Sequence, residues 1–487
     1  MIDRMNKFPK LAQAPGRFAA EWLMNGKWIA GELQLEGKRP PIVAVFGDVA
    51  SINPSDGGVR EFPQDHQLGR LVGRLRSNDD VVVADANVST LFPGSGLGHG
   101  RYAIVGLDVA SIPDDRYEHV RLQITGADLL FGVAPLREIQ WPREGMPYPA
   151  GQYAAVVNAD SSHVWSDAGI ELTCSYDLEF PLTNPYRYEL KFAPVVDIKS
   201  PTPLTLDEWI ATWIRPLLGV TALATRGPQR LAWLSVHTLG AAHEQQPSLQ
   251  TRETSGVVFG GGIEQAPYEA EYPQELMRAD SRPLFTLASI PISLPRLLRD
   301  WRDLESGENP FVELYRLVLF QPDLPRRARF LYLIQALEAL HGYQNRRRDD
   351  EAQLRFGLRR AAVLEAIRHL DLDSKSYRFV REKWSRRRPD SLDRRLEALL
   401  KALPVNVAAD LVRADMVKIE AELVGLDNRS LAAQLRTLRN QLSHGGRNYQ
   451  ESELSPWVRT VETLSRAHLL RMLGFDDVAI ERALLQG

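Results

Sequence analysis

Proline and glycine are distributed very unevenly along this chain of 487 residues. Residues 1–300 contain 25 of the 31 prolines and 26 of the 34 glycines. Because proline breaks a helix interior and glycine weakens one, this region cannot consist mainly of long helices. Its apolar residues come in short runs, and residues 120–124 alternate between apolar and polar as a half-buried strand does. The pattern predicts a β-rich, sandwich-like or barrel-like domain over residues 1–200, with the glycine-rich residues 93–100 in a surface loop.

Residues 201–305 are predicted to be an α+β continuation that leads to a helical bundle. Thr205 and Glu208 have the spacing of a capping box, so a helix should begin directly after Thr205. Strands are expected around residues 231–236 and 256–259, where short apolar runs follow.

Residues 306–487 are predicted to form an all-α bundle. Residues 301–487 hold only 6 prolines and 8 glycines, and 32 Lys and Arg residues against 27 Asp and Glu residues. Proline-containing helix starts are expected at Asn309–Pro310, Pro325 and Ser455–Pro456. Further helices are expected over residues 351–370, 374–387, 391–402, 406–424 and 428–444. Several helices with short connections favour an antiparallel bundle.

The composition excludes several classes of protein. The single cysteine, Cys174, cannot form an internal disulfide or supply a thiolate zinc site. No stretch approaches the roughly 18 uncharged apolar residues that a membrane span needs, so we expect no membrane association. The first residues lack the apolar core of a signal peptide, and the cytoplasm is the expected location. A net charge of -3 neither favours nor excludes a nucleic-acid partner.

The predicted helix over residues 428–444 is the most informative segment of the chain. Projected at about 100° per residue, one stripe of the helix is apolar. It consists of Leu431, Leu435, Leu438 and Leu442. Four hydrogen-bonding side chains share an arc away from that stripe. They are Arg439, Asn440, Ser443 and His444. Gly445 follows and is expected to end the helix in the left-handed conformation.

This arc has the chemistry of a ribonuclease that needs no metal and no cofactor. When a ribose 2′-hydroxyl attacks the neighbouring phosphate, an imidazole can move protons near neutral pH, which is the part expected of His444. The planar guanidinium of Arg439 matches the phosphoryl oxygens on which charge develops. Asn440 and Ser443 can orient the imidazole or the phosphate. An acid–base pair requires two histidines, which a symmetric homodimer would supply in a shared groove. The same side chains are also typical of a merely solvated helix face.

Two helical segments carry a resemblance to a known family. The segment R-N-Q-L-S-H over residues 439–444 resembles the R-x(4–6)-H signature of HEPN ribonucleases. Residues 329–341 resemble the helix that opens the ApeA-like branch of that superfamily, and the spacing of about 100 residues between the segments fits that branch. The β-rich half is similar to the amino-terminal domain of ApeA antiphage proteins. That similarity involves Trp22, Trp28, Gly31 and residues 139–141.

The resemblance implies a function and assigns residues to it. It makes Arg439 and His444 the catalytic pair, with Asn440 as the polar neighbour of the arginine. It implies a metal-independent endoribonuclease that leaves a cyclic phosphate and acts as a dimer. It also implies abortive infection, in which a phage-derived trigger is sensed by the amino-terminal region and RNA cleavage then arrests growth.

Other charged residues are weaker candidates. Glu338 is interpreted as a side chain that orients a catalytic His or Arg, or as a boundary carboxylate paired with an Arg or with His341. Three basic clusters have the charge needed for phosphate contacts: residues 326–329, the triplet of Arg346, Arg347 and Arg348, and residues 386–388. Each cluster is equally typical of a solvated helix end with local ion pairs.

Two alternatives to a ribonuclease stay open at this point. One is a non-catalytic HEPN scaffold that binds RNA or a nucleotide. The other is an interaction protein whose first half senses a phage component and whose bundle serves only for dimerisation.

Overall fold

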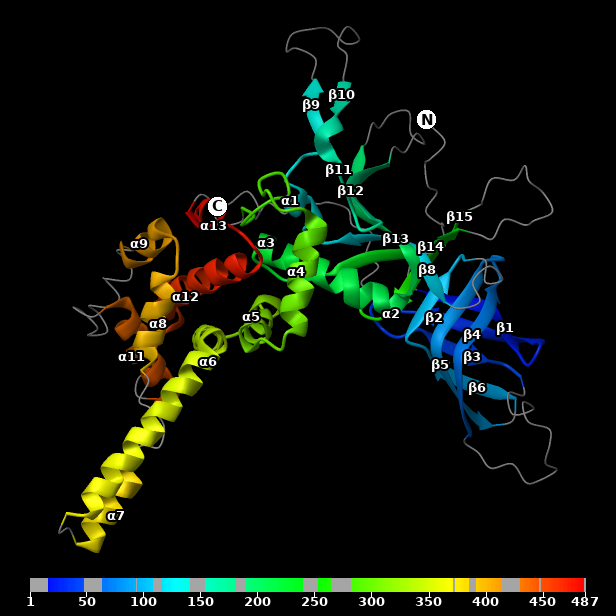
Figure 1. The fold of residues 1–487 in the computed structure, drawn as a ribbon. Coiled ribbons are helices and arrows are strands. Elements are labelled where there is room, and N and C mark those ends of the chain that lie inside the picture. Colours follow the sequence, from blue (N-terminus) through cyan, green and yellow to red (C-terminus); the bar gives the residue numbers. More distant parts are fainter. Residues whose placement is uncertain are drawn as a thin grey trace. The chain divides into compact units, whose positions relative to one another are not determined.

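The protein is described by a computed structural model. It describes residues 16–47, 64–92, 94–107, 115–140, 154–179, 190–239, 253–263, 282–370, 373–384, 391–413, 430–445 and 448–485. The chain divides into two compact units. The first comprises Met1–Thr225 and Gln229–Leu298, and the second comprises Arg226–Pro228 and Arg299–Gly487. The first unit is β-rich and the second is helical, so the predicted fold class is confirmed (Figure 1).

In its described residues, the first unit is built on one antiparallel sheet of 13 strands. The strands are β1 (Gly16–Met24), β2 (Lys27–Leu35), β3 (Ile42–Val45), β4 (Gln64–Leu75), β5 (Asp80–Phe92), β6 (Ser95–His99), β7 (Tyr102–Val105), β8 (Arg116–Ile124), β11 (His163–Asp167), β12 (Ile170–Glu179), β13 (Lys191–Thr205), β14 (Leu231–Leu239) and β15 (Glu253–Gly260). A separate pair consists of β9 (Leu136–Gln140) and β10 (Ala154–Val157).

Six of these strands close into a barrel. The ring runs β1–β2–β3–β6–β5–β4 and returns to β1, because β6 pairs with both β3 and β5. Inside, Trp22 is fully buried and its Nε1 donates to the carbonyl oxygen of Ala44 at 3.0 Å. A Cβ atom at Gly31 or Gly73 would overlap the Trp22 ring, so these positions require glycine. The expected surface loop at residues 93–100 is wrong: residues 95–99, two of which are glycines, form β6, which closes the barrel.

The sheet continues beyond the barrel through β7. Its order there is β7–β15–β14–β8–β13–β12–β11. Helix α1 (Ala127–Phe131) and the helical stretch of α2 (Leu206–Trp209), η4 (Ile210–Ile214) and α3 (Arg215–Thr225) lie in this unit. Trp209 of α2 is fully buried and donates from Nε1 to the carbonyl oxygen of Tyr117 in β8 at 3.0 Å. This hydrogen bond attaches α2 to the sheet.

The predicted capping box is confirmed. The Thr205 hydroxyl accepts from the Glu208 backbone N–H at 3.3 Å, and the Glu208 carboxylate accepts from the Thr205 N–H at 2.8 Å. These hydrogen bonds lower the pKa of Glu208. The predicted boundary at residue 200 falls within β13, and the boundary at residue 305 falls in the last turn of α4 (Leu294–Ser306).

The second unit is a set of helices. After α4 they are α5 (Pro310–Phe320), α6 (Arg326–Arg368), α7 (Ser374–Lys383), α8 (Leu392–Lys401), α9 (Val405–Arg413), α11 (Leu431–His444), α12 (Glu451–Met472) and α13 (Asp477–Leu485). α6 packs against α5, α8, α11 and α12, and α8 also packs against α11. The packing brings helices that are far apart in sequence around one apolar core.

Several expected helix boundaries in this unit are wrong, including the end expected at residue 387, since α7 ends at Lys383. α6 runs unbroken for 43 residues, past the expected start at residue 351, because no proline interrupts it and the intervening Arg346, Arg347 and Arg348 are good helix formers. α12 begins at Glu451, not after Ser455, because Gln450 and Glu453 form a capping box one turn earlier and Pro456 lies inside the helix. By contrast, the expected start at Asn309 is confirmed, since its side chain accepts from the Phe311 N–H at 3.1 Å.

Candidate functional site

Helix α11 carries the predicted catalytic residues and is fixed at both ends. Ser430 caps its start, where the hydroxyl accepts from the Ala433 N–H at 3.3 Å. Its leucine stripe is buried as predicted. Gly445 ends the helix with a φ of 66°, the left-handed conformation that glycine adopts without strain. The polar arc therefore faces away from the core on a well-defined helix.

The basic cluster at residues 326–329 serves structure. Arg327 of α6 donates to the carbonyl oxygen of Leu442 at the end of α11. Arg326 pairs with Glu451 at 3.4 Å, and Arg329 pairs with Glu462. The cluster thus ties the start of α6 to α11 and α12.

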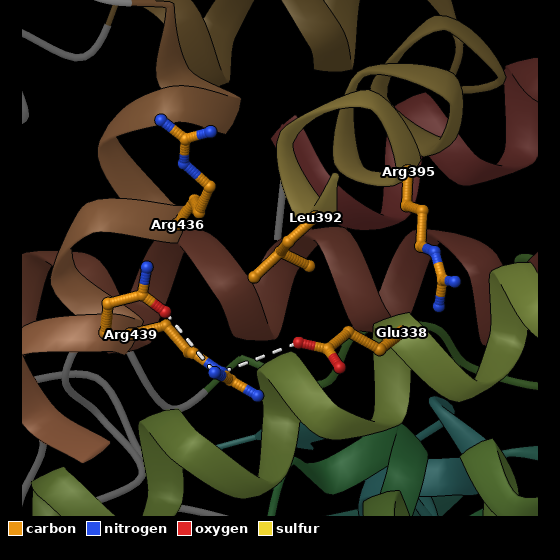
Figure 2. A pocket seen from close by; sticks show the side chains of 6 residues that line it. Glu338, Leu392, Arg395, Arg436 and Arg439 are labelled. Carbon is orange, nitrogen blue, oxygen red and sulfur yellow. Dashed lines mark hydrogen bonds and ion pairs between the residues drawn. The ribbon is translucent and has the colours of Figure 1, made fainter. Parts of the chain in front are cut away.

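A pocket of about 310 Å³ opens between α6, α8 and α11. It is lined by Glu338, Leu392, Arg395, Arg436, Arg439 and Asn440. Glu338 Oε1 of α6 lies 3.6 Å from Arg439 Nε of α11, and Arg439 Nη1 donates to Asn440 Oδ1 at 3.3 Å. Figure 2 shows this arrangement. The structure thus brings together three of the residues proposed from sequence.

The predicted pairing of Glu338 with an arginine is found in this pocket. About a quarter of the Glu338 side chain and a third of the Arg439 side chain are exposed. An ion pair this exposed is weak, because water competes for both charges. A bound anion could therefore take the place of the Glu338 carboxylate on Arg439.

Two arginines of the pocket were missed by the sequence reasoning. Arg436 Nη1 pairs with Asp393 Oδ2 at 3.3 Å, and hydrogen bonding from Ser391, with the charge of Arg436 contributing, lowers the pKa of Asp393. The helical projection does contain a signal for Arg436. It lies about 140° around the helix from Leu431, in the middle of the polar arc. Arg395 comes from α8, and the spacing within α11 contains no signal for it.

His444 and Ser443 lie outside the pocket lining. Both are exposed at the end of α11. His444 follows Arg439 by five residues, which is about 7.5 Å along the helix axis and about 140° around it. Within the described part of the chain, no hydrogen bond or ion pair is recorded for the His444 ring. Its imidazole is open to a ligand or to a second molecule.

The remaining basic clusters differ in position. Arg346, Arg347 and Arg348 are exposed on α6, and they follow Glu338 by eight to ten residues, or roughly 12–15 Å along the axis. Residues 386–388 lie outside the described residues. Among the residues that the structure describes, no group of three His, Cys, Asp or Glu side chains is arranged to hold a metal ion. In the same residues, no helix is long and apolar enough to cross a membrane.

Two protein-family models match the chain. The model of the Apea-like HEPN domain matches residues 331–478, and the model of ApeA N-terminal domain 1 matches residues 22–301, which is more than half of the chain. The chain belongs to the ApeA-like HEPN family. This is a family of antiphage defence proteins, and HEPN domains are generally ribonucleases. No curated protein and no solved structure matches the chain.

The matched ranges relate to the structure in a simple way. The ApeA N-terminal match begins at Trp22, the residue at the centre of the barrel, and it covers the rest of the extended sheet. The Apea-like HEPN match contains the whole pocket and the end of α11 with His444. The basic pocket is thus part of the HEPN domain.

Proposed function

We propose that the helical unit is a metal-independent endoribonuclease of the R-x4-H type and that Arg439 and His444 are its catalytic pair. The observation that carries this proposal is the placement of Arg439 in a basic pocket while the same helix presents an exposed imidazole a turn and a half further on. RNA supplies the anion that such a pocket binds.

The proposed reaction uses these side chains in defined roles. A 2′-hydroxyl attacks the adjacent phosphorus, the bond to the 5′-oxygen breaks, and a 2′,3′-cyclic phosphate forms. One imidazole takes the proton of the 2′-hydroxyl, and a second, protonated imidazole gives a proton to the leaving 5′-oxygen. Arg439 stabilises the charge on the non-bridging oxygens. Asn440, as its hydrogen-bond acceptor, orients the guanidinium.

The two imidazoles are proposed to come from two copies of the chain. Each chain provides one His444, and in the described residues Ser443 is the polar side chain directly beside it on the exposed end of α11. A homodimer with twofold symmetry would bring two such helix ends to one groove. Ser443 would then orient the phosphate or the imidazole.

We further propose that cleavage causes abortive infection in the cytoplasm. In this proposal the amino-terminal unit senses a phage-derived trigger or regulates the nuclease. The exposed triplet of Arg346, Arg347 and Arg348 would provide additional contacts to the RNA backbone.

Comparison of His444→Ala with a matched histidine variant tests this function. His369 is also exposed, near the end of α6, but far from α11 in sequence. In cells challenged with phage, we expect wild type and His369→Ala to restrict plaques and fragment RNA, and we expect His444→Ala to do neither. Loss of the imidazole should reduce the rate of cleavage by about 10²–10⁴-fold.

Other outcomes would overturn the proposal. If His444→Ala protects cells and fragments RNA as wild type does, His444 is not catalytic. If the purified chain binds RNA tightly but never cleaves it, with or without phage components, the helical unit is a binding scaffold.

A further inference from the structure

The walls of the pocket carry an excess of positive charge. Of its six lining residues three are arginines and one is a glutamate. The arginines come from two helices, Arg395 from α8 and the other two from α11, so the charge is assembled by packing and not by one sequence motif. Leu392 adds an apolar wall between them.

Glu338 lies where an anion would bind. Its carboxylate pairs with Arg439 at 3.6 Å, and Figure 2 shows the side chain of Arg395 extending toward Glu338 from the opposite side. Arg436 differs, since its guanidinium points away from Glu338 and pairs with Asp393. The pocket therefore contains a carboxylate paired with one guanidinium, and a second guanidinium lines the pocket from α8.

The position of Arg395 is fixed by its helix. Leu396 and Leu399 of α8 are buried, and α8 packs against both α6 and α11. Arg395 is half-buried beside them and lines the pocket. Arg395 thus brings a guanidinium from α8 to the pocket that Arg439 lines from α11.

We propose that Arg395 is an RNA-binding residue that holds, together with Arg439, one phosphodiester of the RNA, and that this phosphate displaces the Glu338 carboxylate. The inference rests on the proposed function and adds a residue to it. A guanidinium fork matches the two non-bridging oxygens of a phosphodiester, so two forks can hold one phosphate from two sides. The pair with Glu338 is partly exposed, so water lowers the free energy that a bound phosphate must supply to replace it.

Salt-dependent binding provides the test. The probe is a short single-stranded RNA with 2′-O-methyl groups, which lacks the attacking hydroxyl and so binds without being cleaved. The full chain is compared with Arg395→Gln and with Arg395→Lys. Arg378→Gln, which removes an exposed arginine paired with Glu382 on α7, serves as the matched control.

The expected results are specific to a phosphate contact. Arg395→Gln should weaken binding about tenfold at low salt and reduce the slope of log affinity against log salt by about 0.7, the value for one contact to a single strand. Arg395→Lys should restore the slope but only part of the affinity, because lysine keeps the charge without the planar fork. Glu338→Gln should strengthen binding several-fold, and Arg378→Gln should change neither quantity.

Each other result would overturn the inference in a recognisable way. An unchanged slope for Arg395→Gln, with wild-type cleavage of natural RNA intact, removes Arg395 from the RNA site and leaves the nuclease proposal standing. If adenosine 5′-monophosphate binds wild type as tightly as the oligonucleotide and depends on Arg395, the pocket takes a free nucleotide and not the RNA backbone. If wild type neither binds nor cleaves RNA, the proposed function fails as well. Thermal unfolding of each variant verifies that it is folded.

Discussion

Two clusters in the helical unit are both built from arginine and glutamate side chains, but they differ in burial. In the first, Glu462 of α12 accepts from Arg329 of α6 and from Arg466 of α12, the latter at 3.1 Å. These three side chains are only 11–19% exposed. In the second, Arg439 pairs with Glu338 in the pocket, and both side chains are 26–32% exposed.

The difference separates structural charges from charges available to a ligand. Burial makes the first cluster depend on its own partners, since a buried charge without a partner is costly. Tyr315 of α5 adjoins Arg466, and burial raises the pKa of its hydroxyl. The pair of Arg439 and Glu338 is accessible to water, so Arg439 can exchange the carboxylate for another anion. The same residue types therefore hold the bundle together in one place and are free to bind in the other.

The largest effect is expected when the buried cluster is broken. Glu462→Gln leaves two arginines without a counter-charge and should lower the free energy of unfolding by about 4 kcal/mol. The control is Glu382→Gln, which breaks the exposed pair with Arg378 on α7 and should cost less than about 0.5 kcal/mol. Urea denaturation measures both. Equal losses for the two variants would remove the proposed distinction.

The next effect concerns pH. Burial lowers the pKa of His468 on α12 from 6.5 to about 4. Because the folded-state pKa is below the unfolded one, the unfolded chain takes up the proton first. Stability is thus complete above about pH 6.5 and falls by about 3 kcal/mol as the pH decreases to about 4.

Comparison with His468→Gln isolates this contribution, since glutamine does not titrate. The difference in unfolding free energy between wild type and variant should shrink between pH 6.5 and 4. A difference that is constant over this range would show that His468 titrates normally.

A smaller effect is expected at the end of helix α11. Gly445→Ala should cost about 1 kcal/mol, because alanine is strained at a φ of 66°, although its Cβ would meet no atom within 4 Å. Gly445→Asn should cost less, since asparagine tolerates this conformation. Thermal unfolding compares the two, and equal stability of both variants with wild type would contradict the assignment.

The smallest effect on stability is expected in the pocket. Glu338→Gln should change the unfolding free energy by less than about 1 kcal/mol, because water reaches the partly exposed pair with Arg439. Urea denaturation beside Glu462→Gln tests this order. A loss as large as that of Glu462→Gln would make Glu338 a structural residue and would weaken the case for an exchangeable anion.

Local signals in the sequence predicted much of the helical unit and little of its tertiary arrangement. The cap at Asn309, the buried leucine stripe of α11 and the turn at Gly445 all follow from residues within a few positions of one another. The expected start at Ser455 is wrong because a capping box one turn earlier competes with it.

The candidate site was only half predictable for the same reason. The helical projection of α11 places Arg439 and Asn440 on the polar arc, and it places Arg436 there as well. Arg395 and Glu338 reach the pocket through the packing of α8 and α6, which no spacing within one helix encodes. Closure of the barrel depends likewise on pairing of β6 with β3 and β5. The glycines of β6 have low strand propensity, so its sequence predicts a loop.

Strand β5 belongs to the barrel and to the extended sheet at the same time. Val81 pairs with Gly73 of β4 on one side and with Val105 of β7 on the other, while Asn87 pairs with β4 and with β6. The barrel cannot open at β5 without also exposing the edge of the sheet at β7. The first unit should consequently melt as one cooperative block, with the amides of β5 among the last to exchange with deuterated solvent.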